Sequence, residues 1–380
     1  MDTYLLIKQA EVYDAVQDDP YRADILVKDG KIERIEEIIE GRAVNEARII
    51  DADGLRIYPG FVEAHCHLGL DGYTGGFAQE DFNELNDCIT PQLSAVDGIN
   101  PMDPTFAMAR QAGVTCVATG PGSSNVLGGT FAVIKTAGCR VDDMLVKEKA
   151  AMKCAFGENP KNCYREKSIY CRMTIAAKLR ELFYKAIDYE KNETAYDAKL
   201  EALLPVLHKQ MPLKAHVHRA DDIFTAIRIA KEFDIGLTLD HCTEGHLIAE
   251  ELAKEPYSLA VGPSFGHAAK KELENKSFAT PGILADAGCQ VSIITDSPVV
   301  QEQYLTLCAA MAIRSGMKER DALRAITINA ARHIGVSDRV GSIEVGKDAD
   351  FVLIKGSPFV YENEIRYTII DGQIVYERTE

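Results

Sequence analysis

The chain has 380 residues, of which 46% are hydrophobic and 26% are charged, and its formal net charge is -16. This composition is that of a folded globular protein, so it excludes a wholly disordered or fibrous chain. The negative charge is the wrong sign for a surface that follows a phosphate backbone, and we expect no nucleic-acid partner.

Signals for a membrane or for an oxidising compartment are missing from this sequence. The first residues do not form a signal peptide, and no apolar run reaches the roughly 18 residues of a membrane span. Ten cysteines are scattered without a C-x-x-C pair, which is typical of reduced thiols. We therefore expect a cytoplasmic protein without membrane contact.

Both ends of the chain show the pattern of short β-strands joined by tight turns. We predict strands at 4–7, 25–28, 32–35 and 48–51, with Asp29-Gly30 as a hairpin turn. Further strands are expected at 350–354, 367–370 and 373–376, with a second turn at Asp371-Gly372. Neither end has enough apolar residues to close a core alone. The prediction is one small β-sandwich domain built from residues 1–58 and 339–380.

Between these ends, strand-like apolar runs alternate with helical stretches, which is typical of βα units on a parallel sheet. The candidate strands are 59–67, 113–119, 130–135, 150–156, 213–218, 236–241, 257–262 and 289–296. Eight such units predict an α/β fold, a (β/α)8 TIM barrel over residues 59–338. A helix is expected at 320–333. Residues 161–211 are charged and helical, and we interpret them first as a long crossover, with a lid or a subunit contact as alternatives. Residues 69–104 are expected to form a loop at the rim where such barrels form pockets.

The strongest local signal is His65-Cys66-His67, at the end of the first barrel strand. Alternate residues of a strand face the same side. Both imidazoles are therefore expected to point into the barrel, and the cysteine between them is expected to point out.

Later strands end in residues of the same chemistry. His216 ends the fifth strand, His241 the sixth and Asp296 the eighth. Active sites of this barrel lie at the carboxyl ends of the strands, so these side chains converge with His65 and His67. Neutral imidazole and carboxylate are ligands of zinc and similar metals. The sequence therefore predicts a metal centre with these five ligands.

These features make the sequence resemble the amidohydrolase superfamily, and within it the imidazolonepropionase-related metal-dependent hydrolases. The resemblance covers nearly the whole chain and includes Pro59-Gly-Phe-Val-Glu-Ala-His-Cys-His, the strand-end ligands and Val340-Gly-Ser-Ile-Glu-Val-Gly-Lys-Asp-Ala-Asp-Phe-Val. It implies one or two divalent metal ions, with zinc the first candidate. It also implies a small-molecule substrate with a carbon–nitrogen bond in an amide, a cyclic amide or a dipeptide-like compound.

Two-metal members of this superfamily carry a bridging ligand from the fourth strand, which is either a lysine carboxylated by CO2 or a glutamate. Lys153 has the mid-strand position for the first, and Glu158 lies at the strand end, where a shorter side chain reaches. Both alternatives stay open at this point.

The resemblance also implies roles in catalysis. A metal-bound hydroxide would attack the substrate, while Asp296 takes a proton and later passes it to the leaving nitrogen. His241 is assigned to the catalytic machinery together with Asp296. His218 shares the inward face of the fifth strand with His216, and we assign it to substrate binding. Arg219 is assigned there too, because a guanidinium pairs well with a carboxylate.

Two other functions stay open. A mononuclear deaminase of the superfamily resembles H-x-x-E after the fifth strand, but here His216 is followed three residues later by Arg219 and His218 by Asp221. A noncatalytic scaffold would usually lose strand-end ligands, and this chain retains them. About two ions per chain would favour the hydrolase, about one the deaminase, and none the scaffold. A homo-oligomer is compatible with the sequence.

Overall fold

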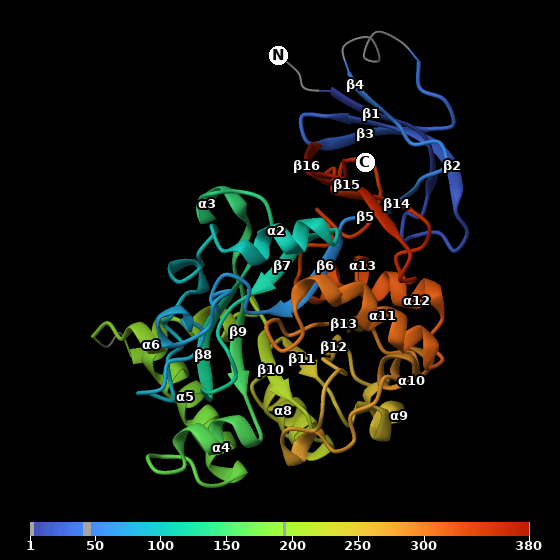
Figure 1. The fold of residues 1–380 in the computed structure, drawn as a ribbon. Coiled ribbons are helices and arrows are strands. Elements are labelled where there is room, and N and C mark those ends of the chain that lie inside the picture. The colour runs from blue at the N-terminus through green and yellow to red at the C-terminus, as the bar shows by residue number, and fades with distance from the viewer. Residues whose placement is uncertain (1–3, 41–46, 193–194, 380) are drawn as a thin grey trace.

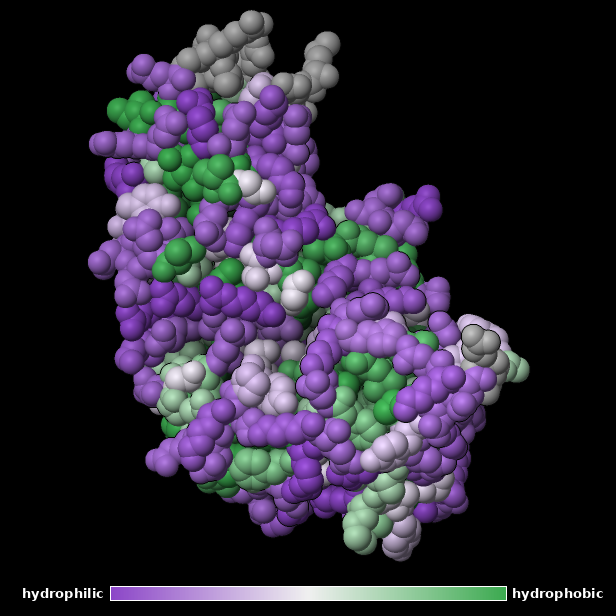
Figure 2. Space-filling model, turned by 180° about the vertical axis from the view of Figure 1, so that it is seen from behind, coloured by the Kyte–Doolittle hydropathy of each residue, from purple (hydrophilic) through white to green (hydrophobic). Residues whose placement is uncertain are grey.

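The computed structural model describes residues 4–40, 47–192 and 195–379. Its strands form two sheets of eight strands each, which Figure 1 shows as two lobes. Figure 2 shows the molecule from behind, where hydrophilic residues predominate and hydrophobic residues gather in separate patches. Among the described residues, no helix combines the length and the apolar composition needed to cross a bilayer.

Strands from both ends of the chain build the sheet of the smaller lobe, in the order β16-β15-β14-β5-β1-β2-β3, with β4 beside β1. They are β1 (Tyr4–Val12), β2 (Tyr21–Lys28), β3 (Lys31–Glu36), β4 (Arg48–Asp51), β5 (Arg56–Pro59), β14 (Phe351–Lys355), β15 (Glu364–Ile370) and β16 (Gln373–Glu377). Because β5 pairs with both β1 and β14, it joins the two ends. Strands lie at every position predicted near the chain ends. The sandwich packing and the domain boundaries stay predictions.

The two predicted hairpin turns contact each other and join the chain ends. Asp29 and Gly30 have φ angles of 48° and 80°, and Asp371 and Gly372 have φ angles of 47° and 72°. Type I′ turns need two positive φ angles, which glycine adopts freely and aspartate tolerates. The Ala349 N–H donates to the Gly30 carbonyl at 2.8 Å, so the C-terminal segment closes on the N-terminal turn.

The second sheet follows the order β6-β7-β8-β9-β10-β11-β12-β13. Its strands are β6 (Phe61–Cys66), β7 (Val114–Thr119), β8 (Leu127–Lys135), β9 (Leu145–Ala155), β10 (Leu213–Val217), β11 (Leu237–His241), β12 (Leu259–Val261) and β13 (Val291–Ile293). All eight predicted barrel strands are present. The gap between β13 and β6 is bridged by Glu63, which accepts hydrogen bonds from the Thr295 and His65 N–H groups at 2.8 and 3.0 Å. The sheet is therefore a nearly closed barrel.

One barrel strand has the wrong direction in the sequence prediction. β8 pairs antiparallel with both β7 and β9, whereas a regular (β/α)8 barrel has parallel strands throughout. Antiparallel neighbours are joined by short connections, and parallel neighbours need a long crossover. Only residues 120–126 separate β7 from β8, and only 136–144, which include a single helical turn, separate β8 from β9. These links are too short for the crossover helices that the sequence interpretation assumed.

Helices and 3-10 turns connect the other barrel strands and cover the outside of the barrel (Figure 1). The helices are α2 (Pro104–Gln111), α3 (Val141–Met144), α4 (Glu158–Tyr164), α5 (Arg172–Asn192), α6 (Ala198–Glu201), α7 (Leu204–Leu207), α8 (Ala220–Glu232), α9 (Ala249–Leu252), α10 (Thr280–Asp286), α11 (Leu305–Arg314), α12 (Glu319–Ala325) and α13 (Ile328–His333). The 3-10 turns are η1 (Phe77–Gln79), η2 (Ala95–Asp97), η3 (Gly245–Ile248), η4 (Lys271–Leu273) and η5 (Glu302–Tyr304). The long α5 lies in the crossover from β9 to β10, and Leu179 and Phe183 pack it into the barrel core.

The single helix predicted at 320–333 is wrong, because the structure contains two helices there. α12 ends at Ala325 and α13 begins at Ile328. Thr327 between them has φ -136° and ψ -104°, which is outside the helical range. Its hydroxyl donates to the Leu323 carbonyl at 2.6 Å, so a side-chain hydrogen bond satisfies this carbonyl at the break.

A buried ion cluster fixes the two lobes to each other. The ammonium group of Lys135, at the end of β8, lies 2.6 Å from Asp350, 3.0 Å from Asp348 and 3.1 Å from Asp371. Asp348 also pairs with Arg339 at 2.9 Å. The side chains of Lys135, Asp348 and Asp350 are at most 4% exposed, whereas Asp371 is half exposed, so the cluster lies inside the junction with one carboxylate at its surface.

Candidate metal centre

The first group of candidate ligands comes from the end of β6 and from the loop after β13. His65 lies on β6 and His67 follows its last residue, so the two are two positions apart, and both are buried. Asp296 follows β13 with a positive φ of 53°. Its Oδ1 lies 3.3 Å from Nε2 of His65 and 3.3 Å from Nε2 of His67. The three ligand atoms lie within 4.8 Å of one another, which is close enough to hold a metal ion.

The second group contains three histidines from two neighbouring strands. His216 lies on β10, His218 follows its last residue, and His241 ends β11 with a φ of 73°. One nitrogen from each lies within 4.8 Å of the others, and all three side chains are buried. The structure therefore places His218 among candidate metal ligands, whereas the sequence interpretation assigned it to substrate.

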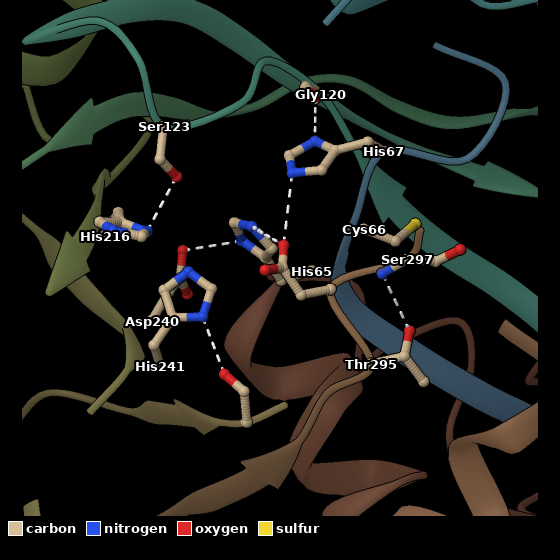
Figure 3. Close-up of polar contacts among 12 residues, drawn as sticks. His65, Cys66, His67, Gly120, Ser123, His216, Asp240, His241, Thr295 and Ser297 are labelled. Carbon is tan, nitrogen blue, oxygen red and sulfur yellow. Dashed lines mark hydrogen bonds and ion pairs between the residues drawn. The ribbon is translucent and has the colours of Figure 1, made fainter. Parts of the chain in front are cut away.

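Every histidine of the two groups is oriented by a hydrogen bond at Nδ1, as Figure 3 shows for His67, His216 and His241. The partners are Asp240 for His65, the Gly120 carbonyl for His67, Ser123 for His216, Thr243 for His218 and the Gly262 carbonyl for His241, at 2.7–2.9 Å. A carbonyl only accepts, so Nδ1 of His67 and His241 carries the hydrogen and Nε2 keeps its lone pair. Metal-binding histidines are held in this way by outer partners.

The second group leaves three buried nitrogens without a hydrogen-bond partner in the part of the chain that the structure describes. These atoms are Nε2 of His216, His218 and His241. Burial lowers the pKa of His216 and His218 well below its usual range and lowers the pKa of His241 to about 3. The rings are therefore neutral at pH 7, and the neutral ring is the form that binds metals. Three buried imidazole nitrogens that converge without partners fit a divalent cation.

Lys153 lies beside the first group, whereas Glu158 pairs with the backbone of another loop. Lys153 lies on β9, is fully buried, and its Nζ is 3.3 Å from Nε2 of His65. Burial lowers its pKa to about 8. Glu158 begins α4, where its Oε1 accepts a hydrogen bond from the Glu272 N–H at 2.9 Å.

Arg219 lies directly before α8 and pairs with a carboxylate of its own chain. Its Nε and one terminal nitrogen donate to the two oxygens of Asp221, each at 2.9 Å. Both side chains are partly exposed. The substrate-binding role of Arg219 stays a prediction.

Sequence reasoning missed a buried network behind the ligands. Asp240 bonds to His65 at 2.9 Å, to the Lys214 ammonium at 2.9 Å and to Nε2 of His333 at 3.1 Å. Burial acts to raise the pKa of Asp240, but Lys214 and His65 outweigh it and hold the pKa well below its usual range. Asp240 directly precedes a predicted ligand in a buried strand. That position is the one sequence signal for the network. An unpaired carboxylate is costly inside a barrel, so Asp240 is expected to have buried partners.

One aromatic neighbour of His67 comes from a loop. Phe82 stacks on the imidazole of His67, with ring centroids 5.0 Å apart. It belongs to the 69–104 segment, which the sequence placed at the rim of the barrel. A long loop after the first strand therefore contributes to the wall of the site.

A protein-family model described as Amidohydrolase family matches residues 56–375. The chain belongs to the amidohydrolase family. A solved structure of an amidohydrolase from Thermotoga maritima MSB8 has 40% sequence identity and a TM-score of 0.95, covering 98% of this chain and 100% of that one. The match therefore includes both lobes and the whole candidate centre.

Curated relatives agree with this family. Amidohydrolase tasK from Hapsidospora irregularis is 28% identical over 88% of this chain, and the match covers 38% of that protein's length. An imidazolonepropionase from Porphyromonas gingivalis is 23% identical over 87% of this chain and 83% of that protein. The resemblance to imidazolonepropionase-related proteins is confirmed.

Proposed function

We propose that this protein is a metal-dependent hydrolase that cleaves a carbon–nitrogen bond of a small molecule in an amide, a cyclic amide or a dipeptide-like substrate. The observation that carries the proposal is the convergence of histidine Nε2 atoms, each oriented at Nδ1, beside a buried aspartate in an amidohydrolase fold. Divalent ions bound there, with zinc the first candidate, would supply an ionised water and an electrophile for the substrate carbonyl.

Each of the two groups of ligands would hold one ion. His65, His67 and Asp296 would hold one ion, and His216, His218 and His241 the other. Rings of the two groups are adjacent, because the centroids of His65 and His241 lie 5.1 Å apart. This proximity supports a centre for two ions rather than two separate sites, which favours the hydrolase over a mononuclear deaminase.

Lys153 is the better candidate for the bridging ligand. Its Nζ lies against His65, and the side chain is shielded from water. A carbamate formed from the neutral amine and CO2 would present two oxygens toward the groups on either side. Glu158 is less suited because its Oε1 is already engaged by the Glu272 backbone.

Asp296 would accept and return the proton of the reaction. Burial acts to raise its pKa, but the imidazoles of His241, His65 and His67 beside it outweigh burial and hold the pKa well below its usual range. The carboxylate is therefore ionised at neutral pH and can accept a proton. Asp296 lies beside both histidines of β6, close to where a bound substrate would react.

A hydrolysis screen tests this proposal. Zinc- or manganese-loaded protein is incubated with N-acyl amino acids, dipeptides, lactams and hydantoins, and released amine or acid is measured. Asp296→Asn should lower kcat/KM of the best substrate by at least about 100-fold. Asp286→Asn is the matched control, because Asp286 forms an exposed pair with Lys318. No turnover with any compound, or undiminished turnover in Asp296→Asn, would contradict the proposal.

A further inference from the structure

A buried carboxylate faces the second histidine group from an element that contains none of the predicted site residues. Glu272 lies on η4, in the long connection between β12 and α10. Its side chain is 1% exposed, and its Oε1 lies 3.8 Å from Nε2 of His218 and 4.0 Å from Nε2 of His216. Both nitrogens lack a hydrogen-bond partner in the described structure. The carboxylate is therefore aimed at the point where a second ion would lie.

A reciprocal pair of hydrogen bonds fixes the orientation of Glu272. The Glu158 N–H donates to Oε2 of Glu272 at 2.8 Å, and the Glu272 N–H donates to Oε1 of Glu158 at 2.9 Å. Gly157 has a φ of 80°, and a Cβ there would lie 2.4 Å from Oε2 of Glu272. The backbone at 157 and 158 thus leaves room for Oε2 of Glu272, while Oε1 faces the histidines.

Positive side chains balance the charge of this carboxylate. The Lys270 ammonium lies 2.7 Å from Oε1 of Glu272 and also donates to Asn159 at 2.7 Å. A terminal nitrogen of Arg172 lies 3.9 Å from Oε2. A carboxylate oxygen has two lone pairs, so pairing with Lys270 leaves one on Oε1 for a ligand.

Two ligands of one tetrahedral zinc ion lie roughly 3.3–3.4 Å apart when the zinc–ligand distances are about 2.0–2.1 Å. Oε1 of Glu272 lies 3.8 Å from Nε2 of His218 and 4.0 Å from Nε2 of His216, so a contraction of roughly half an ångström would let it share an ion with these two histidines. We infer that Glu272 is the fourth protein ligand of the ion held by His216, His218 and His241. This inference rests on the metal occupancy of the proposed function.

Four protein ligands make this a closed site, unlike the first group. Structural zinc sites have four protein ligands, and catalytic sites keep a position open for water or substrate. The ion at the second group would then be retained without Lys153, whose carbamate would be a fifth ligand. Substrate chemistry would take place at the side of His65, His67 and Asp296, which supplies only three ligands.

Metal-binding measurements on a variant without the first group test the inference. In the His65→Ala/His67→Ala background we expect one zinc or cobalt ion per chain, with affinity measured by competition with a chelator. Adding Glu272→Gln should weaken metal binding by more than about 100-fold. Loss of a residue that only hydrogen-bonds to a ligand costs about 10–100-fold in metal affinity, so a larger loss indicates a direct ligand. The cobalt absorption spectrum should change as well. Glu274→Gln is the matched control, because Glu274 is exposed on the same loop and pairs with Lys271.

A loss of less than 100-fold with an unchanged cobalt spectrum would overturn the assignment of Glu272 as a ligand. If Glu272→Gln does not fold, zinc-soaked crystals of the unaltered chain decide: the ligand role requires Oε1 within about 2.2 Å of the ion. An oxygen more than about 3 Å away would overturn it. Binding through Glu272 without any hydrolysis would keep this inference and refute the proposed function. Hydrolysis without a Glu272–metal bond would keep the proposed function and refute this inference.

Discussion

Two clusters of polar side chains lie mostly inside this protein, and they differ in how their polar atoms are partnered. In the junction between the lobes, Lys135 contacts the buried Asp348 and Asp350 and the half-exposed Asp371 at 2.6–3.1 Å. In the candidate metal centre, Nε2 of His216, His218 and His241 has no hydrogen-bond partner among the described residues. Both clusters bring together residues that are far apart in the sequence, but only the first is complete.

The difference separates a structural cluster from a binding site. A buried polar atom without a partner costs about 1–3 kcal/mol, so three such atoms at one point are costly unless a ligand satisfies them. Charges that are paired on all sides need no ligand. Burial of ionisable groups alone therefore does not indicate a site, whereas burial with converging free lone pairs does.

Strained backbone also differs between the candidate metal centre and the small lobe. His241, Cys242 and Asp296 have φ angles of 73°, 44° and 53° at the ends of barrel strands. In the small lobe, Asp29 and Asp371 have φ angles of 48° and 47° inside hairpin turns, where aspartate is tolerated. His241 lies at the end of a strand and Asp296 begins a hydrogen-bonded turn, and at both positions the strained backbone orients a candidate ligand.

The largest expected effect is at the junction. Lys135→Met should lower the free energy of unfolding by about 3–5 kcal/mol at pH 7, because the buried carboxylates of Asp348 and Asp350 lose the cation that they share. Urea unfolding followed by circular dichroism measures this change. Lys318→Met is the control, since its pair with Asp286 is exposed and should contribute less than about 1 kcal/mol. Equal unfolding midpoints for the two variants would show that the junction cluster does not stabilise the fold.

The sequence predicted much of the fold because strands and turns leave periodic signals. All eight barrel strands and the terminal hairpins follow from apolar runs and the Asp-Gly pairs. The direction of β8 was missed, because an apolar run has no direction and only the short flanking links reveal it. The break at Thr327 was missed for a similar reason, since a helical pattern continues across it.

The candidate site was predictable only where its residues end strands. His65, His67, His216, His241 and Asp296 follow from their places at strand ends. Loop residues such as Glu272 and Phe82 have no periodic signal, so their contacts with the histidines are visible only in three dimensions. The position of His218 among the candidate ligands depends on the path of the chain after β10, which alternation does not specify.

The second prediction tests the unpartnered histidines in the metal-free protein. Burial lowers the pKa of His241 to about 3, below the usual 6.5, so the folded ring stays neutral while the unfolded ring binds a proton. Stability is therefore lost as pH falls from 6.5 toward 3, by about 2 kcal/mol for this histidine between pH 7 and pH 5. His241→Asn removes that loss, and asparagine tolerates a positive φ.

Chelator-treated wild type and His241→Asn should be compared by urea unfolding at pH 7 and pH 5. The wild type should lose about 2 kcal/mol more than the variant over this interval. Zinc in excess should stabilise the wild type at pH 7, since it binds the folded state. The same loss in both proteins would mean that the proton is taken up elsewhere, and that His241 is not held neutral by burial.

The smallest effect concerns the contact between the hairpin turns at the junction. Gly30 and Gly54 have φ angles of 80° and 77°, but a Cβ on Gly30 would lie 3.1 Å from the Asp371 carbonyl oxygen, whereas none of the described atoms lies within 4 Å of one on Gly54. Gly54→Ala should cost about 1 kcal/mol from backbone strain alone. Gly30→Ala should cost about 1 kcal/mol more, because the Asp371 backbone has to move and this turn is tied to Ala349.

Thermal unfolding of the two glycine variants measures this difference. Because φ is nearly the same at both positions, the strain of the left-handed conformation cancels in the comparison and only the contact between the turns remains. A lower melting temperature for Gly30→Ala would show that this contact couples the two ends of the chain energetically. Equal melting temperatures would assign that coupling to the Lys135 cluster and the paired strands instead.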